Sequence, residues 1–255
     1  MNISEARAVI TGGASGLGNA VAQHVIKAGG KVALLDVQEV LGNTAAAALG
    51  PNAIFLPCDV TNEQNVNDTV QRAQEFLKGI NLAVNCAGVV GAGRMLGKNG
   101  PMSGEFFAKV VHINLIGTFL VDKACADLMT KNTPNADGER GLIIHTSSVA
   151  AFEGQIGQVA YSATKGAVMA MTLPIARELS AFGIRVATIA PGVFWTPMVG
   201  GMTQELQDSL SSQVPFPKRL GRPEEYASLV AHIFQSPYLN GETIRLDGAI
   251  RMQPK

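Results

Sequence analysis

The chain has little charge and no strongly basic segment. Charged residues make up 16% of its 255 residues, the formal net charge is zero, and no run of Lys or Arg exceeds two. These features do not favour a nucleic acid or an anionic membrane as a partner. The charged share lies below the about 25% of typical globular proteins, which fits either surface buried in an oligomer or a larger core.

Cysteine and histidine are also scarce. Cys58, Cys86 and Cys125 form no CxxC pair, and the four histidines show no metal-ligand spacing. Isolated cysteines in odd number fit reduced thiols better than a disulfide framework, so we expect a cytoplasmic protein without a bound metal. No apolar run reaches membrane-spanning length, no signal-peptide pattern is visible, and the first predicted strand lies close to Met1, which leaves little room for a targeting segment.

Apolar segments alternate with segments of helical spacing along the whole chain. Such alternation predicts an α/β fold in which helices cover both faces of a parallel sheet. No repeat, low-complexity tract or domain boundary interrupts it. The predicted strands are residues 6–11, 31–36, 53–57, 82–85, 142–144, 184–190 and 242–246. The main predicted helices follow residue 18, span 40–49, 62–77 and 105–130, and begin near 159 and at 223.

A glycine-rich segment, TGGASGLG (residues 11–18), lies between the first strand and the first helix. Gly12, Gly16 and Gly18 allow a tight turn, and backbone N–H groups at the start of the helix can face a pyrophosphate. A strand, a glycine loop, a helix and a second strand within about 30 residues form the setting of a dinucleotide fingerprint. We therefore predict a dinucleotide site, although glycine-rich loops also form ordinary turns.

Asp36 ends the second strand, 18 residues after Gly18. An acid at that place can accept hydrogen bonds from both ribose hydroxyls of the adenosine, and it repels a 2′-phosphate. No Lys or Arg lies in the glycine loop or directly after Asp36. The sequence thus favours NAD over NADP, and a solvated acid at a strand end is the alternative.

Other strand ends carry residues that suit the same ligand. Asp59 and Val60 follow the third strand, where they suit an adenine amino group and ring. Ala87 and Gly88 follow the fourth strand and let the backbone pass close to a ribose. Thr196, after the sixth strand, offers a hydroxyl to a carboxamide. Taken alone, each of these residues would be interpreted as an ordinary loop residue without a role in ligand binding.

Three reactive side chains are predicted to converge after the fifth strand. Tyr161 and Lys165 are four residues apart in a predicted helix and share a face, and Ser148 follows the strand, 13 residues before the tyrosine. A surface pair at helical spacing is the alternative for the tyrosine and the lysine. Asn114 lies in an apolar part of a predicted helix, so it is either a hydrogen-bonded core amide or the holder of a water near the tyrosine.

Two loops lie beside this predicted site. Residues 89–104 form a long glycine-rich loop, for which function and mobility are competing interpretations. Residues 199–213 combine glycines with a short predicted helix and are interpreted as a lid over an apolar substrate or as a surface excursion. We expect the substrate to lie against the loops near Gly93 and Met202.

The motifs TGGASGLG, NCAG (residues 85–88), Asn114, Ser148 with YSATK (161–165) and PGVFWT (191–196) resemble the short-chain dehydrogenase/reductase family in order and spacing. The resemblance implies a single Rossmann-type, doubly wound domain over residues 1–255, with a seven-stranded parallel sheet. A cofactor half would span about 1–140 and a catalytic and substrate half about 141–255. Beyond the residues above, it places these around NAD: Ser15, Leu17, Cys86, Tyr161, Lys165, Pro191, Gly192 and Phe194.

The resemblance also implies hydride transfer between nicotinamide and a secondary alcohol or ketone. Tyr161 would be the general base, and Lys165 and the positive nicotinamide would lower its pKa. Ser148 would donate to the substrate oxygen, and Asn114 would hold a water that links Lys165 to solvent.

Three segments are similar to the type 2 branch of 3-hydroxyacyl-CoA dehydrogenases within that family. They are residues 147–166, 171–178 and 240–254. This branch implies a homotetramer that uses NAD on short or branched 3-hydroxyacyl-CoA thioesters. The alternatives are a 3-oxoacyl-acyl-carrier-protein reductase, a hydroxysteroid or secondary-alcohol dehydrogenase, and, in a different class, a non-catalytic dinucleotide-binding scaffold.

Overall fold

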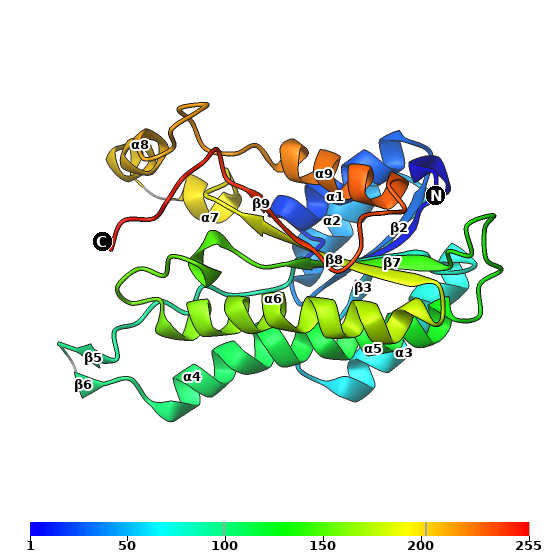
Figure 1. The fold of residues 1–255 in the computed structure, drawn as a ribbon, viewed down its shortest axis with the longest axis horizontal. Coiled ribbons are helices and arrows are strands. Elements are labelled where there is room, and N and C mark those ends of the chain that lie inside the picture. Colours follow the sequence, from blue (N-terminus) through cyan, green and yellow to red (C-terminus); the bar gives the residue numbers. More distant parts are fainter. Residues whose placement is uncertain (99, 202, 255) are drawn as a thin grey trace.

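Seven parallel strands form the centre of the molecule (Figure 1), a computed structural model that describes residues 1–98, 100–201 and 203–254. The strand order is β3-β2-β1-β4-β7-β8-β9, and every paired neighbour is parallel. The predicted seven-stranded parallel sheet with helices on both faces is confirmed. The strands are β1 (Arg7–Thr11), β2 (Lys31–Asp36), β3 (Ala53–Pro57), β4 (Leu82–Asn85), β7 (Gly141–Thr146), β8 (Ile184–Pro191) and β9 (Thr243–Leu246).

The side chains of the strands alternate between two hydrophobic cores, one on each face of the sheet. On β1, Ile10 belongs to the core that packs against α1 and α9, while its neighbour Val9 belongs to the core that packs against α3 and α5. This alternation explains why the strands read as continuous apolar runs, since both faces are covered. The helices in this arrangement are α1 (Gly16–Lys27), α2 (Glu39–Leu49), α3 (Glu63–Leu77), α5 (Gly117–Met129), α6 (Val159–Ser180) and α9 (Pro223–Gln235).

The predicted helix over 105–130 is interrupted by a π-helical turn. The segment consists of α4 (Gly104–Val111), the π turn η2 (His112–Ile116) and α5. Although no single run of apolar residues has spanning length, the whole stretch Gly104–Met129 is long and apolar enough to cross a membrane by length and composition. That test rests on length and composition alone, and the core helix of a globular protein passes it too.

The two loops beside the predicted site contain short elements. The loop over 89–104 includes a small antiparallel pair, β5 (Leu96–Gly97) and β6 (Gly100–Pro101). The segment after residue 196 contains α7 (Pro197–Gly200) and α8 (Gln204–Ser212). Met202, which we expected against the substrate, lies outside the described residues. In Figure 1, α7 and α8 lie near the C-terminal tail, at the same end of the molecule as the β5–β6 pair.

The sheet reverses its strand order at β1. From there the chain proceeds outward to β2 and β3 on one side, and to β4, β7, β8 and β9 on the other. The loops that follow β1 and β4 therefore leave in opposite directions, which opens a crevice at the carboxyl ends of these strands. This edge is where the sequence predicted the ligand-binding residues.

Candidate active site

The glycine loop is shaped so tightly that side chains would not fit. Gly12 has a positive φ of 62°, and a Cβ there would come within 2.8 Å of the Cys86 carbonyl carbon. A Cβ on Gly18 would come within 2.4 Å of the Gly12 oxygen. The loop backbone therefore lies close to the end of β4, and α1 begins at the crevice. This is the cradle that a dinucleotide pyrophosphate needs at a helix N-terminus, so the residues fit such a cofactor.

The first turn of α1 begins at Gly16, directly after Ser15 in extended conformation. The Ser15 side chain makes no capping hydrogen bond, so the first N–H groups of the helix are left for a ligand. A Cβ on Gly16 would lie 3.6 Å from the methyl group of Thr196. The glycine loop and the segment after β8 therefore face each other across the crevice.

The Asp36 carboxylate is held in place by two backbone donors. The Ala14 N–H donates to Oδ2 at 3.2 Å, and the Gln38 N–H donates to Oδ1 at 3.1 Å. Because one donor comes from the glycine loop, the carboxylate is fixed relative to that loop. Its remaining lone pairs can accept hydrogen bonds from a ribose.

The ends of β3 and β4 form the next part of the wall. The Asp59 carboxylate accepts from the N–H and the hydroxyl of Thr61, at 2.9 and 2.8 Å. The Ala87 N–H donates to the Thr11 hydroxyl at 3.1 Å, which ties the strip after β4 to the end of β1. Small residues at 87 and 88 keep this strip close to the crevice.

Cys86 contributes a thiol to the same wall. The Thr146 hydroxyl donates to its sulfur at 3.5 Å, and the thiol donates to the Tyr226 hydroxyl at 3.9 Å. Burial raises the pKa of Cys86, and the hydrogen bond from Thr146 opposes that rise. The raised pKa disfavours the thiolate, which is the nucleophilic form of cysteine.

The segment after β8 closes the crevice on its far side. The Gly192 N–H donates to the Leu246 carbonyl at 2.9 Å, and a Cβ on Gly192 would lie 2.9 Å from the Asp247 Cα. Phe194 is buried next to this turn. Pro191 and Gly192 therefore bend the chain away from the sheet where the tail after β9 passes.

Ser148, Tyr161 and Lys165 lie around one cavity at the edge of the sheet. Ser148 follows β7 and caps the short 3₁₀ helix η3 (Val149–Ala151), since its Oγ accepts from the Ala150 N–H at 3.1 Å. Tyr161 and Lys165 project from the first turns of α6, with the Lys165 Nζ 5.8 Å from the centre of the phenol ring. The Lys165 ammonium donates to the Thr146 carbonyl at 2.6 Å. That bond fixes the ammonium beside the tyrosine.

Burial dominates the protonation of these groups. It lowers the pKa of Lys165 to about 8. It also raises the pKa of Tyr161, although a hydrogen bond with Ser148 opposes this rise. The lowered pKa expected for Tyr161 depends on Lys165 together with the positive nicotinamide, and burial works against it in the protein alone.

Asn114 lies just behind the cavity, on the π turn η2. Its side chain is fully buried. Oδ1 accepts from the Val89 N–H at 2.8 Å, and Nδ2 donates to the Val89 carbonyl at 2.9 Å and to the Thr164 hydroxyl at 3.1 Å. A Cβ on Gly88 would meet the Asn114 Oδ1 at 3.1 Å and the Lys165 Nζ at 3.6 Å. Asn114 is thus a satisfied core amide that also adjoins Lys165.

The cavity has a volume of about 740 Å³, and every predicted site residue except Asn114 lines it. Gly93 is not part of the lining among the described residues, although we expected substrate near it. The lining includes these predicted residues: Gly12, Ser15, Gly16, Leu17, Gly18, Asp36, Asp59, Val60, Cys86, Ala87, Gly88, Ser148, Tyr161, Lys165, Pro191, Gly192, Phe194 and Thr196.

Sequence reasoning missed several residues that line the cavity, most of them apolar. Val199 and Leu210 lie in the segment 199–213, and its interpretation as a lid already indicated that it borders the cavity. Met252 belongs to the C-terminal tail, for which the sequence carried no chemical signal. The lining residues that the sequence did not single out include Val149, Gln155, Gln158, Val193, Val199, Leu210 and Met252. Within the described residues, no group of three or more His, Cys, Asp or Glu side chains could hold a metal ion.

The chain was compared with known families, proteins and structures. A profile of the family described as short chain dehydrogenase matches residues 6–207. The 3-hydroxyacyl-CoA dehydrogenase type-2 of Drosophila melanogaster is 50% identical over 254 residues, 99% of this chain and 100% of that one. The Homo sapiens protein of the same name is 51% identical over 249 residues, 97% of this chain and 95% of that one. The crystal structure of 3-hydroxyacyl-CoA dehydrogenase type-2 from Mycobacterium avium superposes with a TM-score of 0.93 at 38% identity, covering 97% of this chain and 96% of that one.

Proposed function

We propose a substrate and a cofactor for this chain, which belongs to the short-chain dehydrogenase/reductase family and is an oxidoreductase that uses a nicotinamide dinucleotide. The substrate is a short or branched 3-hydroxyacyl-CoA, and the cofactor is NAD. The reaction moves a hydride from C3 of the substrate to the nicotinamide and releases the hydroxyl proton, which leaves a 3-ketoacyl-CoA and NADH.

One observation carries the reaction type: the hydroxyl, phenol and ammonium of Ser148, Tyr161 and Lys165 line the same cavity as the glycine cradle. The nicotinamide supplies the hydride acceptor when the cofactor is bound. Tyr161 takes the proton of the substrate hydroxyl, and Ser148 donates a hydrogen bond to the same oxygen. Lys165, held by its bond to the Thr146 carbonyl, stabilises the phenolate of Tyr161 through its charge.

Asn114 is proposed to hold a water between Lys165 and solvent. Three of its four hydrogen-bonding positions are taken by Val89 and Thr164. The second lone pair of Oδ1 remains for a water, on the side where Lys165 lies. The proton accepted by Tyr161 can leave by that route.

The preference for NAD rests on Asp36. Its carboxylate lies at the end of β2 and lines the cavity. Two backbone donors fix it. It can therefore accept hydrogen bonds from ribose hydroxyls, and its negative charge repels a 2′-phosphate.

The thioester class rests on the relatives of that name and on the cavity. Apolar side chains of Val149, Val193, Val199, Leu210 and Met252 line the same cavity as Ser148, which suits a short acyl chain. The competing functions are reduction of acyl-carrier-protein thioesters and dehydrogenation of a steroid or another secondary alcohol. A non-catalytic scaffold would not need the Ser–Tyr–Lys set.

The test is a panel of initial rates with purified protein. Acetoacetyl-CoA, acetoacetyl-acyl-carrier protein and a 17-ketosteroid are each reduced with NADH and with NADPH, and Tyr161→Phe is the control. We expect the highest kcat/KM for acetoacetyl-CoA with NADH. A higher value for the acyl-carrier thioester or for the steroid would refute the substrate, and a higher value with NADPH would refute the cofactor.

We also propose that the chain assembles as a homotetramer. Helices α4, α5 and α6 present exposed apolar side chains although they lie on one side of the sheet (Figure 1). Exposed large apolar side chains on neighbouring helices favour association. The residues are Phe106, Phe107, Phe119, Val159 and Leu173, together with Ile116 at the end of the π turn η2. Light scattering after gel filtration should give four times the mass of one chain; a monomeric mass would refute it.

A cytoplasmic location is proposed because the three cysteines are free thiols, as expected in a reducing compartment. Fractionation of cells that express the untagged chain would test this location.

A further inference from the structure

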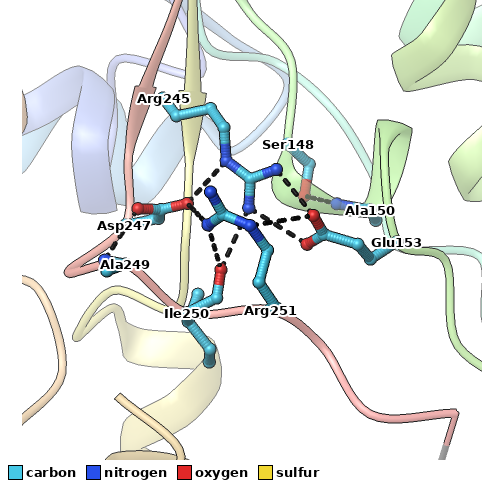
Figure 2. A network of polar contacts seen from close by, with 8 residues as sticks. All are labelled: Ser148, Ala150, Glu153, Arg245, Asp247, Ala249, Ile250 and Arg251. Carbon is cyan, nitrogen blue, oxygen red and sulfur yellow. Dashed lines mark hydrogen bonds and ion pairs between the residues drawn. The ribbon is translucent and has the colours of Figure 1, made fainter. Parts of the chain in front are cut away.

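Four charged side chains form a cluster beside Ser148 (Figure 2). The Arg245 guanidinium donates to both carboxylate oxygens of Glu153, at 2.7 and 3.0 Å, and its Nε donates to Asp247 at 2.7 Å. Arg251 contacts the same two acids, with Nη1 3.3 Å from Asp247 and Nε 3.5 Å from Glu153. Each guanidinium therefore bridges both carboxylates.

The cluster joins segments that are far apart in the sequence. Glu153 follows η3, Arg245 lies on β9, and Asp247 and Arg251 lie on the tail after β9. The hydrogen bond from Arg245 holds the pKa of Glu153 below its usual value, so the carboxylate is ionised at neutral pH. Bidentate pairs of Arg and carboxylate fix orientation as well as distance.

On one side the cluster is tied to Ser148. The Glu153 N–H donates to the Val149 carbonyl at 3.0 Å. Val149 and Ala150 follow Ser148 directly, and the Ala150 N–H donates to the Ser148 Oγ. Only one short turn separates the anchored carboxylate from the hydroxyl that faces the cavity.

On the other side the cluster is tied to the wall of the cavity. Gln155 and Met252 both line the cavity, and the Gln155 side chain donates to the Gln253 carbonyl at 3.0 Å. The Ile156 N–H donates to the Pro254 carbonyl at 3.0 Å. Because the tail lies outside the sheet ladder, these bonds and the cluster hold it against the loop.

The tail also contacts the segment between α8 and α9. Ile250 is fully buried and packs in a small core with Val149 and Val214. The Phe216 N–H donates to the Gly248 carbonyl at 3.3 Å. The tail thus touches both the loop that carries Ser148 and the chain that leaves the predicted lid.

We propose that the cluster of Glu153, Arg245, Asp247 and Arg251 positions the tail as the acyl-side wall of the cavity and so limits the length of acyl chain that is accepted. This inference rests on the proposed function. Glu153 is a positioning residue here, because it acts through Ser148 and Met252 and has no contact of its own with the cavity. The cofactor half of the site is built mainly from other strand ends, and Glu153 has no contact with it; of the cluster, Asp247 lies against Gly192.

The test compares Glu153→Gln with the wild type on acetoacetyl-CoA and 3-ketodecanoyl-CoA, with NADH. Gln keeps the size of the side chain and removes the charge that both guanidinium groups share. We expect KM for acetoacetyl-CoA to rise about tenfold, since misplacement of about 1 Å can cost up to a hundredfold. The ratio of kcat/KM for the ten-carbon over the four-carbon substrate should rise at least fivefold, and KM for NADH should stay within twofold.

The matched control is Glu225→Gln. Glu225 also accepts a bidentate pair, from Arg219 at 2.9 and 2.6 Å, but it does not line the cavity. We expect no change in the chain-length ratio for this variant. If Glu153→Gln does not fold, Arg251→Gln decides the question, because Arg251 is 60% exposed and its removal should give a smaller shift in the same direction.

The inference is overturned by an unchanged ratio, by a parallel rise in KM for NADH, or by an equal shift in the Glu225 control. Failure of the proposed function gives a different result, since the wild type would then reduce neither thioester. In that case 2-butanone and 2-decanone replace the thioesters. The ratio of kcat/KM for the ten-carbon over the four-carbon ketone then decides whether the cluster limits chain length.

Discussion

Replacing Asp36 by alanine should exchange the cofactor preference. The carboxylate is oriented by the N–H groups of Ala14 and Gln38 at 3.2 and 3.1 Å. Hydrogen bonds to a charged group contribute about 1.5–3 kcal/mol each. Losing two ribose bonds at the lower end of that range removes about 3 kcal/mol, or about 150-fold in kcat/KM for NADH, at tenfold per 1.4 kcal/mol.

The same substitution should improve the use of NADPH. A carboxylate and a phosphate about 4 Å apart repel each other by about 1–4 kcal/mol, depending on how much water screens them. Asp36 is partly exposed, so the lower end applies, and kcat/KM for NADPH should rise about fivefold, at tenfold per 1.4 kcal/mol. The ratio of the two cofactors should thus shift about 750-fold, as the product of the two effects.

The assay measures initial rates of acetoacetyl-CoA reduction at varied NADH and NADPH, together with the dissociation constant of each cofactor by fluorescence titration. The titration needs no substrate, so it tests Asp36 even if the thioester assignment fails. Glu39→Ala is the control, because Glu39 is an exposed acid three residues on, at the start of α2. A variant at Asp36 that keeps its full preference for NADH would refute the reasoning, as would an equal shift in the control.

Other perturbations should act on the catalytic residues and on the core. Tyr161→Phe should lower kcat at least about a hundredfold, the usual scale of acid–base catalysis, with the dissociation constant of NADH within twofold; near-normal turnover would exclude Tyr161 as the base. Burial lowers the pKa of Lys165 to about 8, so the unfolded chain binds more protons than the folded one between that value and the ordinary value. The free energy of unfolding of the wild type, relative to Lys165→Met, should therefore rise from pH 8 to pH 10 in urea titrations; a constant difference contradicts this. Asp122→Ala removes the buried partner of His145 at 2.8 Å and should cost about 2–4 kcal/mol of stability in urea denaturation, whereas the exposed Asp127→Ala should cost under about 0.5 kcal/mol; equal losses would mean that the buried contact is not the cause.

Much of the fold follows from local pattern. The continuous apolar strands and the helices between them predict a parallel sheet, and a parallel sheet places every strand end on one edge. That is why Gly12, Asp36, Asp59 and Ser148 could be assigned to one site before their distances were known. Because helices alternate with strands along the chain, all strands are expected to run in the same direction, and that common direction places these four residues at the same edge of the sheet.

The π turn over His112–Ile116 could not be predicted in this way. An extra residue in one helical turn is a response to packing, and helix propensity does not encode it. Here the turn contains Asn114, whose amide finds its partners on Val89 and Thr164. The sequence indicated that Asn114 needs a partner, but not which backbone would supply it.

The acyl-side wall was missed for a different reason. Met252 lines the cavity because Arg245 binds Glu153, and 92 residues separate these two in the chain. Such a pair has no periodic or local signature. Charge alone would assign Arg245 and Arg251 to a solvated tail, so only the folded chain shows that they bridge the same two acids.

The side chains of the protein alone do not lower the pKa of Tyr161. Burial favours the neutral form of both Tyr161 and Lys165, since it raises the pKa of the phenol and lowers that of the ammonium. The hydrogen bond from Ser148 offsets only part of this effect on Tyr161. Lys165 is the cationic side chain in the described lining, and at a pKa of about 8 it is still mostly charged at neutral pH. An oxidised nicotinamide would bring a further positive charge to the cavity when bound, and that charge would favour the phenolate of Tyr161.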